Sequence, residues 1–346
     1  MTPVRINLYS DTQTEPSREM RMAMAEAEVG DEQHGLDPSV NRLCEEVAER
    51  LGKEKAIFLP SGTMCNQIAI AVHCSPGDEI ITDRTAHIVN SEAAGSAVFA
   101  GAAIRIVNSE RGIFNSSDIE KSIRKARPLE PRSRLVVVEQ TSNGGGGSIW
   151  PLAALSEVAS AARDNGLVIH MDGARLLNAV VASKTRSEEF TNLVDSVWLD
   201  LTKGLGCPVG AVLAGSDAFI KEAWRWKHRL GGAMRQAGIL AAAGSWALSN
   251  HVDRLEEDHV NAREFARQIS LIEGITILNP EVETNLVFFD VTKAGWSSDR
   301  LSAELRNRGV WIGRYGLKGM RAVTHLGINR SDIEDAVSCV SRLLSN

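Results

Sequence analysis

The stretch SVWLDLTKGLGCP, residues 196–208, combines a predicted strand with a lysine between glycines and is the most informative part of this chain about its fold. Its first six residues are mostly apolar, which is typical of a strand buried on both faces of a parallel sheet. Lys203 follows almost at once, and Gly204 and Gly206 leave room for other groups to approach it. A lysine partly removed from water can act as an amine nucleophile, but most isolated lysines simply extend to the solvent. The other strands must decide between these two interpretations.

Six other short segments have the same mostly apolar character. They are KAIFL (55–59), EIIT (79–82), AIRIV (103–107), RLVVVEQ (134–140), LVIHMD (167–172) and GAVLAG (210–215). Amphipathic segments lie between them, and one has clear helix boundaries, with Asp37 as N-cap, Pro38 at the first helical position and Gly52 at the end. This alternation predicts an α/β fold with a mostly parallel, seven-stranded sheet and helices on both faces.

The C-terminal part of the chain has a different pattern. From about Ala237 the sequence predicts one long helix that extends to residue 269. It then predicts strands and helices in the order 285–291 (strand), 297–309 (helix), 310–316 (strand), 320–325 (strand) and 331–344 (helix). We therefore expect a large domain at 1–250, including an N-terminal arm, and a smaller α+β domain at 251–346.

The composition excludes several kinds of partner. A net charge of −6 on 346 residues gives no basic surface for nucleic acid or an anionic membrane. The run WRWKHR (224–229) is explained most simply as a solvated helix face. The five cysteines include no CxxC pair, which indicates reduced thiols rather than disulfides or a zinc site. Without an apolar signal segment or a stretch long enough to span a bilayer, we expect a cytoplasmic protein with a small-molecule partner.

Polar residues follow two more of the predicted strands. Ser61, Gly62 and Thr63 open a helix, where free backbone N–H groups suit a phosphate. Ordinary N-capping by the serine explains them equally well. Asp172 ends another strand and Arg175 lies one turn further on, so a structural ion pair is the simplest explanation of these two. Neither group identifies a site by itself.

Together with the lysine, these groups match the requirements of pyridoxal 5′-phosphate. In an open parallel sheet, ligands bind beyond the carboxyl ends of the strands. There the helix start can hold the phosphate, Asp172 can keep the ring nitrogen protonated, and Lys203 can hold the aldehyde as a Schiff base. We favour this interpretation over three unrelated structural features.

Nearly the whole chain resembles one enzyme family. The similarity includes the ordered blocks YSDTQTEPSREMRMAMAEAEVGDE, HGLDPSVNRL, FLPSGTMCNQ, AHIVNSEAAGSAV, HMDGARLLNA, LTKGLGCPVGAVLAG, RLGGAMRQAG, EDHVNARE and MRAVTHLGINR. The chain is similar to the threonine aldolase and β-eliminating lyase family of pyridoxal-phosphate enzymes. That resemblance implies the aspartate-aminotransferase-type fold, also called fold type I.

The resemblance also assigns the cofactor contacts. It implies that Lys203 is the Schiff-base lysine and that Asp172 is the partner of the pyridine nitrogen. It places Gly62 and Thr63 at the phosphate and stacks His87 on the ring. These assignments agree with the roles that the strand ends suggest.

Further residues are assigned to the substrate and to a second subunit. The resemblance places Arg175 near the ring oxygen and the substrate carboxylate, and Ser10 and Arg321 at the same carboxylate, for which a planar guanidinium is well shaped. It implies that Arg235 reaches the phosphate of a neighbouring subunit. A homotetramer with active sites at the dimer interface is therefore expected.

Three positions depart from the family pattern. Ser142 in EQTSN stands where the family has a histidine, and Ser91 stands where it has a tyrosine. His34 in HGLDP also replaces a tyrosine. The cofactor residues are intact while these three substrate-side positions differ, which predicts a shift in substrate choice or in the detailed mechanism.

The expected reaction is cleavage of a β-hydroxy-α-amino acid to glycine and an aldehyde. His87, His34 or an ordered water could replace the missing histidine as the base, with His87 or water preferred. Two serines in place of larger side chains leave extra room, so we expect a β-substituent larger than the methyl of threonine, such as an aryl or charged group. The alternatives are β-elimination, transaldol exchange, racemisation at Cα, or a non-catalytic α/β protein that binds phosphate.

Two other patterns need an explanation. Four consecutive glycines, 144–147, follow a predicted central strand, and we expect them to form part of the substrate wall rather than an interdomain linker. His251, Asp258 and His259 could suggest a metal site, but their spacing on a polar helix favours a solvated face. We expect no metal site.

Overall fold

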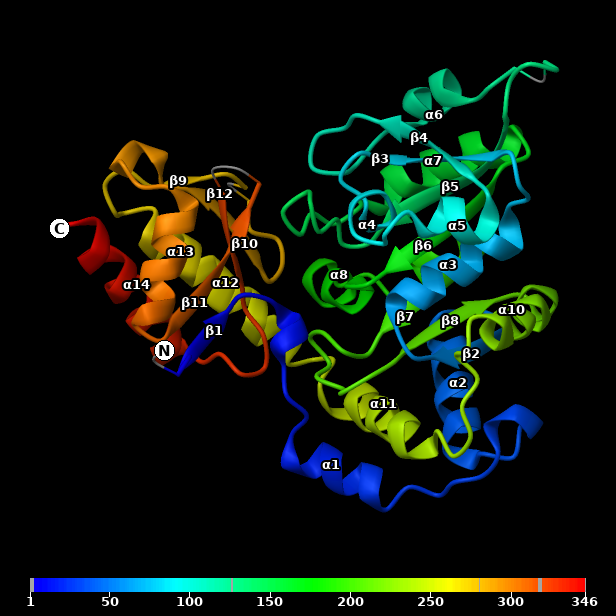
Figure 1. Cartoon of the computed structure of the whole chain (residues 1–346), viewed down its shortest axis with the longest axis horizontal. Coiled ribbons are helices and arrows are strands. Elements are labelled where there is room, and N and C mark those ends of the chain that lie inside the picture. Colours follow the sequence, from blue (N-terminus) through cyan, green and yellow to red (C-terminus); the bar gives the residue numbers. More distant parts are fainter. Residues whose placement is uncertain (1–2, 126, 280, 317–318, 346) are drawn as a thin grey trace.

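Figure 1 shows a large lobe and a small lobe that lie side by side. The computed structural model describes residues 3–125, 127–279, 281–316 and 319–345. The sheet of the large lobe has the order β2-β8-β7-β6-β5-β3-β4. Its strands are β2 (Lys55–Leu59), β3 (Asp78–Asp83), β4 (Ala103–Val107), β5 (Arg132–Glu139), β6 (Val168–Gly173), β7 (Ser196–Asp200) and β8 (Ala211–Gly215). β8 runs antiparallel to both neighbours and the other pairs are parallel, which confirms the predicted mostly parallel, seven-stranded sheet.

Helices cover both faces of this sheet, as predicted. They are α1 (Arg18–Ala25), α2 (Pro38–Arg50), α3 (Gly62–His73), α4 (His87–Asn90), α5 (Gly95–Ala100), α6 (Ser116–Ser122), α7 (Leu152–Asp164), α8 (Leu176–Ser183), α9 (Ser187–Thr191), α10 (Asp217–Arg229) and α11 (Gly238–Asn250). Within the described part of the chain, no helix is both long and apolar enough to cross a membrane.

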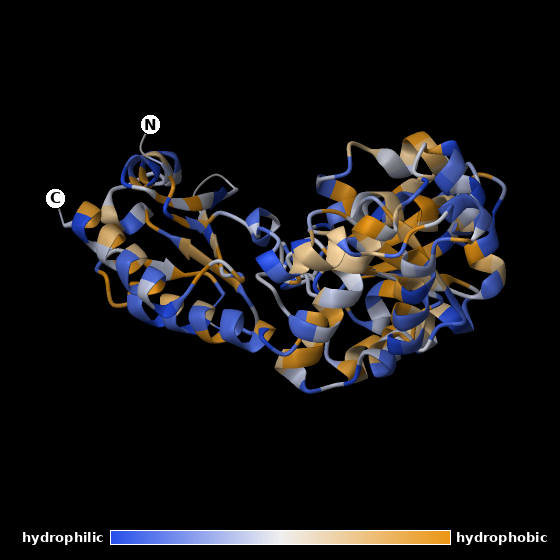
Figure 2. Ribbon diagram, turned by 90° about the horizontal axis from the view of Figure 1, so that it is seen from below, coloured by the Kyte–Doolittle hydropathy of each residue, from blue (hydrophilic) through white to orange (hydrophobic). Residues whose placement is uncertain are grey.

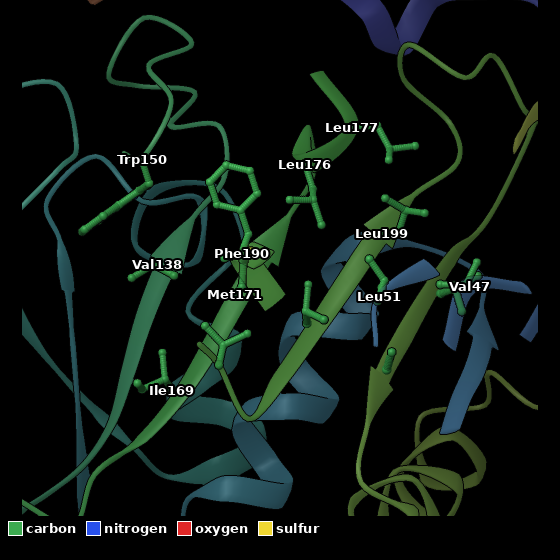
Figure 3. Packing of buried hydrophobic residues seen from close by; sticks show 14 of the residues in the cluster. Val47, Leu51, Val138, Trp150, Ile169, Met171, Leu176, Leu177, Phe190 and Leu199 are labelled. Carbon is green, nitrogen blue, oxygen red and sulfur yellow. The ribbon is translucent and has the colours of Figure 1, made fainter. Parts of the chain in front are cut away.

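The pleat of β6 and β7 decides which side chains meet the core and which meet the site. Successive side chains of a strand point to opposite faces. Met171 and Leu199 therefore pack into the apolar core on one face, with Phe190 and α2 nearby (Figure 3). Trp198 points to the other face and packs against α3 and α10. Asp172 and Asp200, which end these strands, have the same parity as Trp198 and so share the α3 side.

The small lobe is built on a five-stranded sheet of order β1-β11-β12-β10-β9. The strands are β1 (Ile6–Leu8), β9 (Thr276–Ile277), β10 (Leu286–Asp290), β11 (Val310–Tyr315) and β12 (Gly319–Val323), and the helices are α12 (Leu255–Ile269), α13 (Ser298–Asn307) and α14 (Arg330–Leu344). Apolar residues gather on the strands of both lobes (Figure 2). β1 pairs with β11, so the N-terminal arm crosses to this lobe, and the domain boundary near residue 250 stays a prediction.

The single long helix predicted from residue 237 to 269 is wrong. The chain forms α11 and α12, separated by residues 251–254. The side-chain amide of Asn250 donates to the carbonyl of Trp246 (2.7 Å) in the last turn of α11. His251 Nδ1 then lies 2.7 Å from the carbonyl oxygen of Leu205, outside the helix. The first contact binds a carbonyl in the last turn of α11, and the second holds the side chain of His251 against the loop at Leu205. Neither glycine nor proline marks the break.

The run 224–229 is not a solvated face throughout, because Lys227 is fully buried. Its Nζ forms an ion pair with Glu32 and donates to the carbonyl of Phe58 (2.7 Å). The other oxygen of Glu32 accepts the backbone N–H of Met234 (2.9 Å), and the N–H of Glu32 donates to the carbonyl of Arg235 (3.0 Å). The buried pair thus fixes the loop before α2 to the loop before α11.

Replacing Lys227 by methionine is predicted to lower the free energy of unfolding by about 3 kcal/mol, because Glu32 is left buried without its counter-ion. Urea denaturation of the full chain measures the change. Lys221→Met is the matched control on the same helix, since its ion pair with Asp217 is exposed. Equal loss of stability in the two variants would show that the buried pair has no special role.

Candidate active site

A cleft of about 390 Å³ lies at the carboxyl ends of the large sheet. That volume is in the range of small-molecule sites. Ten of the thirteen residues predicted for the site line it: Ser10, Ser61, Gly62, Thr63, His87, Ser91, Asp172, Arg175, Lys203 and Arg321. The structure therefore brings together residues from the N-terminal arm, the large sheet and β12 of the small lobe.

Two predicted residues lie on the surface instead. The side chains of His34 and Arg235 are 71% and 61% exposed. Both contact one carboxylate, that of Asp31, at 3.0 Å from His34 Nδ1 and 3.2 Å from Arg235 Nη1. Among the residues that the structure describes, neither lines the cleft of its own chain.

Ser142 is buried and is also absent from the described lining of the cleft. Its Oγ accepts the backbone N–H of Gly145 (3.1 Å), so its hydroxyl stabilises the turn of the glycine run. A Cβ on Gly112 would lie 2.0 Å from that hydroxyl, which leaves no space on this side. The neighbouring residue, Asn143, lines the cleft.

The glycine run connects the two lobes by hydrogen bonds. The carbonyls of Gly144, Gly146 and Gly147 accept from side chains that belong to the C-terminal part of the chain: Tyr315 (2.8 Å), Asn279 (3.0 Å) and Thr284 (2.9 Å). Gly146 and Gly147 have φ values of +85° and +76°, which L side chains rarely adopt. The run is thus a docking loop beside the cleft.

The start of α3 can bind an anion. Ser61 is the N-cap, and its Oγ accepts the N–H of Met64 (3.2 Å), so the capping interpretation is confirmed. The first N–H groups of a helix have no partner within the helix, and its dipole favours a negative charge there. Gly62 must be small, because a Cβ would lie 2.2 Å from the ring of Trp198. This close approach fixes the helix start at the edge of the cleft.

Asp172 is a buried carboxylate at the end of β6. Its oxygens accept from Asn66 Nδ2 (2.8 Å) and from the backbone N–H of Ala174 (3.0 Å). Burial raises the pKa of Asp172 above its usual range. No ion pair with a lysine or arginine neutralises it among the described residues, so a cation in the cleft would be a favourable partner.

Asn66 of α3 holds this carboxylate in place by a hydrogen bond. It also donates to Glu92 (2.7 Å), while its Oδ1 accepts from Trp198 Nε1 (2.7 Å). His170 Nε2 lies 3.1 Å from the same oxygen. Burial lowers the pKa of His170 to about 3, so this imidazole is neutral and adds no charge to the network.

His87 and Glu92 form a dyad on another side of the cleft. His87 Nδ1 lies 2.8 Å from a Glu92 oxygen. An ionised carboxylate only accepts, so Nδ1 donates and Nε2 is left as the proton acceptor of the neutral ring. This hydrogen bond is the main reason that the pKa of His87 is raised. The backbone N–H of His87 donates to Glu139 (2.7 Å), and burial raises the pKa of Glu139 to about 7.

The two arginines of the cleft have different partners. Asp11 accepts from Arg175 Nε and Nη2, both at 2.7 Å, and although burial opposes it, this pairing holds the pKa of Asp11 well below its usual range. Arg321 has no carboxylate partner among the described residues. Its Nη1 donates to Asn143 Oδ1 (3.1 Å), which also lies 3.4 Å from Arg175 Nη1. Arg321 is therefore the guanidinium left for an anionic ligand.

Lys203 lies in the loop after β7, and its side chain is 20% exposed. Its Nζ contacts Asp200 Oδ2 and lies 5.6 Å from the centre of the Trp198 ring. The amine is thus held inside the cleft rather than extended to the solvent.

Sequence reasoning missed several residues of the site. They are Asp11, Asn66, Glu92, Glu139, Asn143 and Asp200. Glu139 and Asp200 are the last residues of β5 and β7 and come one residue before the ends of the predicted strands, so their positions in the sequence could have pointed to them. Asn66 lies one helical turn after Gly62, a spacing that places it on the same side of α3.

The expectation of a solvated face for His251, Asp258 and His259 is wrong, because all three are buried. The atoms that could bind a metal nevertheless contact different residues. His259 Nε2 lies 3.1 Å from Asn178 Nδ2, and Asp258 accepts a hydrogen bond from Arg254 (2.9 Å). In the described ranges, donor atoms converge within 4.8 Å only at His87, Glu92 and Asp172. There direct hydrogen bonds to Asn66 and between His87 and Glu92 already join the groups.

The cleft fits pyridoxal phosphate. The α3 start suits the phosphate, the unneutralised Asp172 suits a protonated ring nitrogen, and Lys203 supplies an amine for the aldehyde. These three groups line one cavity. Located at the carboxyl edge of a mostly parallel seven-stranded sheet, they define a pyridoxal-phosphate enzyme of fold type I.

Comparisons with known proteins identify the family. Residues 7–294 match the Beta-eliminating lyase family. Low-specificity L-threonine aldolase 1 of Arabidopsis thaliana is 37% identical over 344 residues, which cover 98% of this chain and 96% of that protein. The low specificity L-threonine aldolase of Escherichia coli (strain K12) is 39% identical over 336 residues, 96% of this chain and 97% of that one. The chain belongs to the Beta-eliminating lyase family.

A solved structure supports the fold. Threonine aldolase of Leishmania major superposes with a TM-score of 0.84 at 20% identity, covering 98% of this chain and 99% of that one. The resemblance inferred from the sequence is therefore confirmed, as are the fold class, the lyase class and the dependence on pyridoxal phosphate.

Replacing Asn66 by alanine is predicted to weaken pyridoxal-phosphate binding at least about tenfold, because Asp172 loses a donor and the Trp198 N–H loses its acceptor. Titration of the cofactor-free protein, followed by visible absorbance, gives the affinity. Asn261→Ala is the control, since that buried amide donates to Ile328 in the small lobe. Unchanged affinity in a folded Asn66→Ala protein would contradict the supporting role.

Proposed function

We propose that this enzyme cleaves β-hydroxy-α-amino acids to glycine and an aldehyde. The relatives at 37% and 39% identity are low-specificity L-threonine aldolases. The observation that carries the proposal is that Arg321, a guanidinium without a carboxylate partner among the described residues, lines the same cleft as Lys203 and Asp172. An amino-acid carboxylate bound there would have its amine near the cofactor groups.

The chain's own residues hold the cofactor at three points. Thr63 and the backbone N–H groups from Gly62 onward bind the phosphate, with Ser61 capping the helix. Asp172 stabilises the protonated ring nitrogen, and Lys203 holds the aldehyde. When bound, pyridoxal phosphate supplies an aldehyde that combines with amines and a protonated ring that accepts the electron pair of the broken Cα–Cβ bond.

The substrate carboxylate is bound by Arg321, with Ser10 at the edge of the same site. A planar guanidinium can donate two parallel hydrogen bonds to a carboxylate. Arg175 plays a different part, because Asp11 already occupies two of its donors. Nη1 of Arg175 and Nη1 of Arg321 both face Asn143 Oδ1, so this amide lies between the two arginines.

His87 takes the proton of the β-hydroxyl group. Glu92 fixes the imidazole through Nδ1, which leaves Nε2 of the neutral ring to accept a proton, and the same carboxylate stabilises the imidazolium that then forms. His34 is exposed outside the cleft of its own chain, and the hydroxyl of Ser142 is bonded to the glycine loop. The structure thus favours His87 over His34 as the base.

Ser91 supports a substrate side chain larger than the methyl of threonine. It lines the cleft directly, and its small side chain leaves open the space that a tyrosine would fill. Ser142 contributes less to this space, because its side chain is turned into the loop. We infer an aryl or charged β-substituent next to Ser91.

A second copy of the chain completes the site, and we propose the expected homotetramer with active sites at the dimer interface. Arg235 and His34 are exposed and held together by Asp31. Several residues close to these three in the sequence have exposed apolar side chains. They are Met22, Val29, Leu36 and Ile239, which are 45–68% exposed. Such a surface is suited to contact with another subunit, where Arg235 would reach the phosphate of the partner's cofactor.

A reducing compartment, the cytoplasm, is also proposed. All five cysteines are free thiols, and three of them are buried. Burial raises the pKa of Cys44 and Cys74 to about 12, so both remain unreactive thiols at neutral pH.

The function is tested by assaying glycine release from threonine, allo-threonine and phenylserine. Glycine and free aldehyde are expected in equal amounts, with higher kcat/KM for phenylserine. Lys203→Ala is expected to abolish both the yellow colour of the bound cofactor and the activity, because the amine that holds the aldehyde is gone.

Other products would redirect the assignment. Ammonia and a keto acid would indicate β-elimination, and loss of optical activity without glycine would indicate racemisation. Exchange of the aldehyde without net glycine would indicate transaldol chemistry. Faster turnover of threonine than of phenylserine would overturn the inference about side-chain size.

Mixing Lys203→Ala subunits with Arg235→Ala subunits tests the shared site. If Arg235 acts across the interface, each hybrid dimer contains one intact site, and random reassembly restores up to about a quarter of wild-type activity. Glycine release before and after subunit exchange measures this. A mixture no more active than the mean of its two parents would show that Arg235 acts within its own chain.

A further inference from the structure

Asp200 is a buried carboxylate at the end of β7. It has no part in the cofactor binding, substrate binding or proton transfer proposed above. Its side chain is 3% exposed and lines the cleft. Because it follows Trp198 by two residues, it points to the same face of the sheet. It therefore lies at the end of β7 on the same side of the sheet as Asp172 and next to Lys203.

Both oxygens of Asp200 are held in place. Oδ1 accepts the backbone N–H and the hydroxyl of Thr202, both at 2.9 Å. Oδ2 contacts Nζ of Lys203. The loop that carries the lysine thus also orients the carboxylate that binds it, and the lysine has a defined resting position.

Other charges act on Lys203 from a greater distance. Asp11 of the N-terminal arm and Asp172 of β6 both interact electrostatically with it. Arg175, at the start of α8, is itself influenced by Asp200. Among the described residues, Asp200 is the carboxylate that forms an ion pair with Nζ.

This contact matters for the chemistry of the amine. An ammonium has no lone pair, so Lys203 must lose a proton before its nitrogen can attack an aldehyde carbon. The proton passes to the carboxylate, which becomes a carboxylic acid. The nitrogen then forms a double bond to the former aldehyde carbon, and the aldehyde oxygen leaves as water. No oxidant or further reactant is needed.

We propose that Asp200 is a positioning residue that holds the Lys203 ammonium whenever the lysine is not joined to the cofactor, and that accepts its proton when it reacts. The inference rests on the proposed function, in which the substrate amine repeatedly replaces the lysine. Each time, the released lysine returns to Asp200 and stays within reach of the aldehyde.

The pH dependence of Lys203 reactivity tests this in the full-length, cofactor-free protein. Acetic anhydride acetylates neutral amines, and mass spectrometry of the peptide that contains Lys203 gives the rate. In Asp200→Asn the ammonium loses its counter-ion, so the profile is expected to move at least about one pH unit lower. Labelling at pH 7 should be about tenfold faster. Asp200→Glu keeps the charge and should restore most of the wild-type profile.

The chain offers a matched control in Asp217→Asn, which removes the exposed carboxylate that pairs with Lys221. Screening by water makes that contact weak, so the labelling of Lys221 should change less than about twofold, and that of Lys203 not at all. If Asp200→Asn does not fold, Asp200→Ala is measured instead, with the same shift expected.

An unchanged Lys203 profile in the folded Asp200→Asn or Asp200→Ala protein would overturn the proposal. So would an equal shift in Asp200→Asn and Asp200→Glu, because a purely structural role does not depend on the charge. The labelling is independent of turnover. Failure to release glycine in the substrate assay would therefore refute the aldolase function without changing this result.

Discussion

One buried amide, Asn66, connects the parts of this active site. Its helix, α3, starts at the phosphate cradle, and one turn later Asn66 donates to Asp172 and to Glu92. The same side chain accepts from Trp198, against whose ring the helix start packs so closely that residue 62 must be glycine. The proposed phosphate site, the carboxylate proposed for the ring nitrogen and the partner of His87 are thus held together by one hydrogen-bonded unit.

The small lobe contributes the groups that arrange the two arginines of the cleft. Asn285 donates to Asp11 (3.0 Å) and to the carbonyl of Thr324 (3.0 Å), so the N-terminal arm and the end of β12 are joined at the cleft. Asp11 then binds Arg175 of the large lobe. Because Arg175 is paired with Asp11, the proposed substrate carboxylate is assigned to Arg321. Separation of the lobes would expose both charges of the pair, so the carboxylate site forms only when the lobes are docked.

The strands and the groups at their ends could be predicted from the sequence, because parallel strands bring their carboxyl ends to one edge of the sheet. Asn66 and Asp11 could not, since their roles depend on how a helix and an arm pack against strands elsewhere in the chain. Lys227 was assigned to a solvated face because its partner, Glu32, lies 195 residues away. At the break between α11 and α12, His251 contacts Leu205, a residue that the local sequence pattern does not contain.

The family pattern suggested that Ser142 leaves extra room for the substrate, but in the structure its side chain stabilises a loop. It does not simply leave an empty space on the substrate wall, because its hydroxyl binds Gly145 within a loop whose carbonyls accept from Asn279, Thr284 and Tyr315. The serine therefore stabilises the loop that docks the small lobe, and the proposed base, His87 with its partner Glu92, lies on another side of the cleft. The proposed room for a larger substrate side chain then depends on Ser91, which lines the cleft, whereas none of the glycines 144–147, all within the described residues, does.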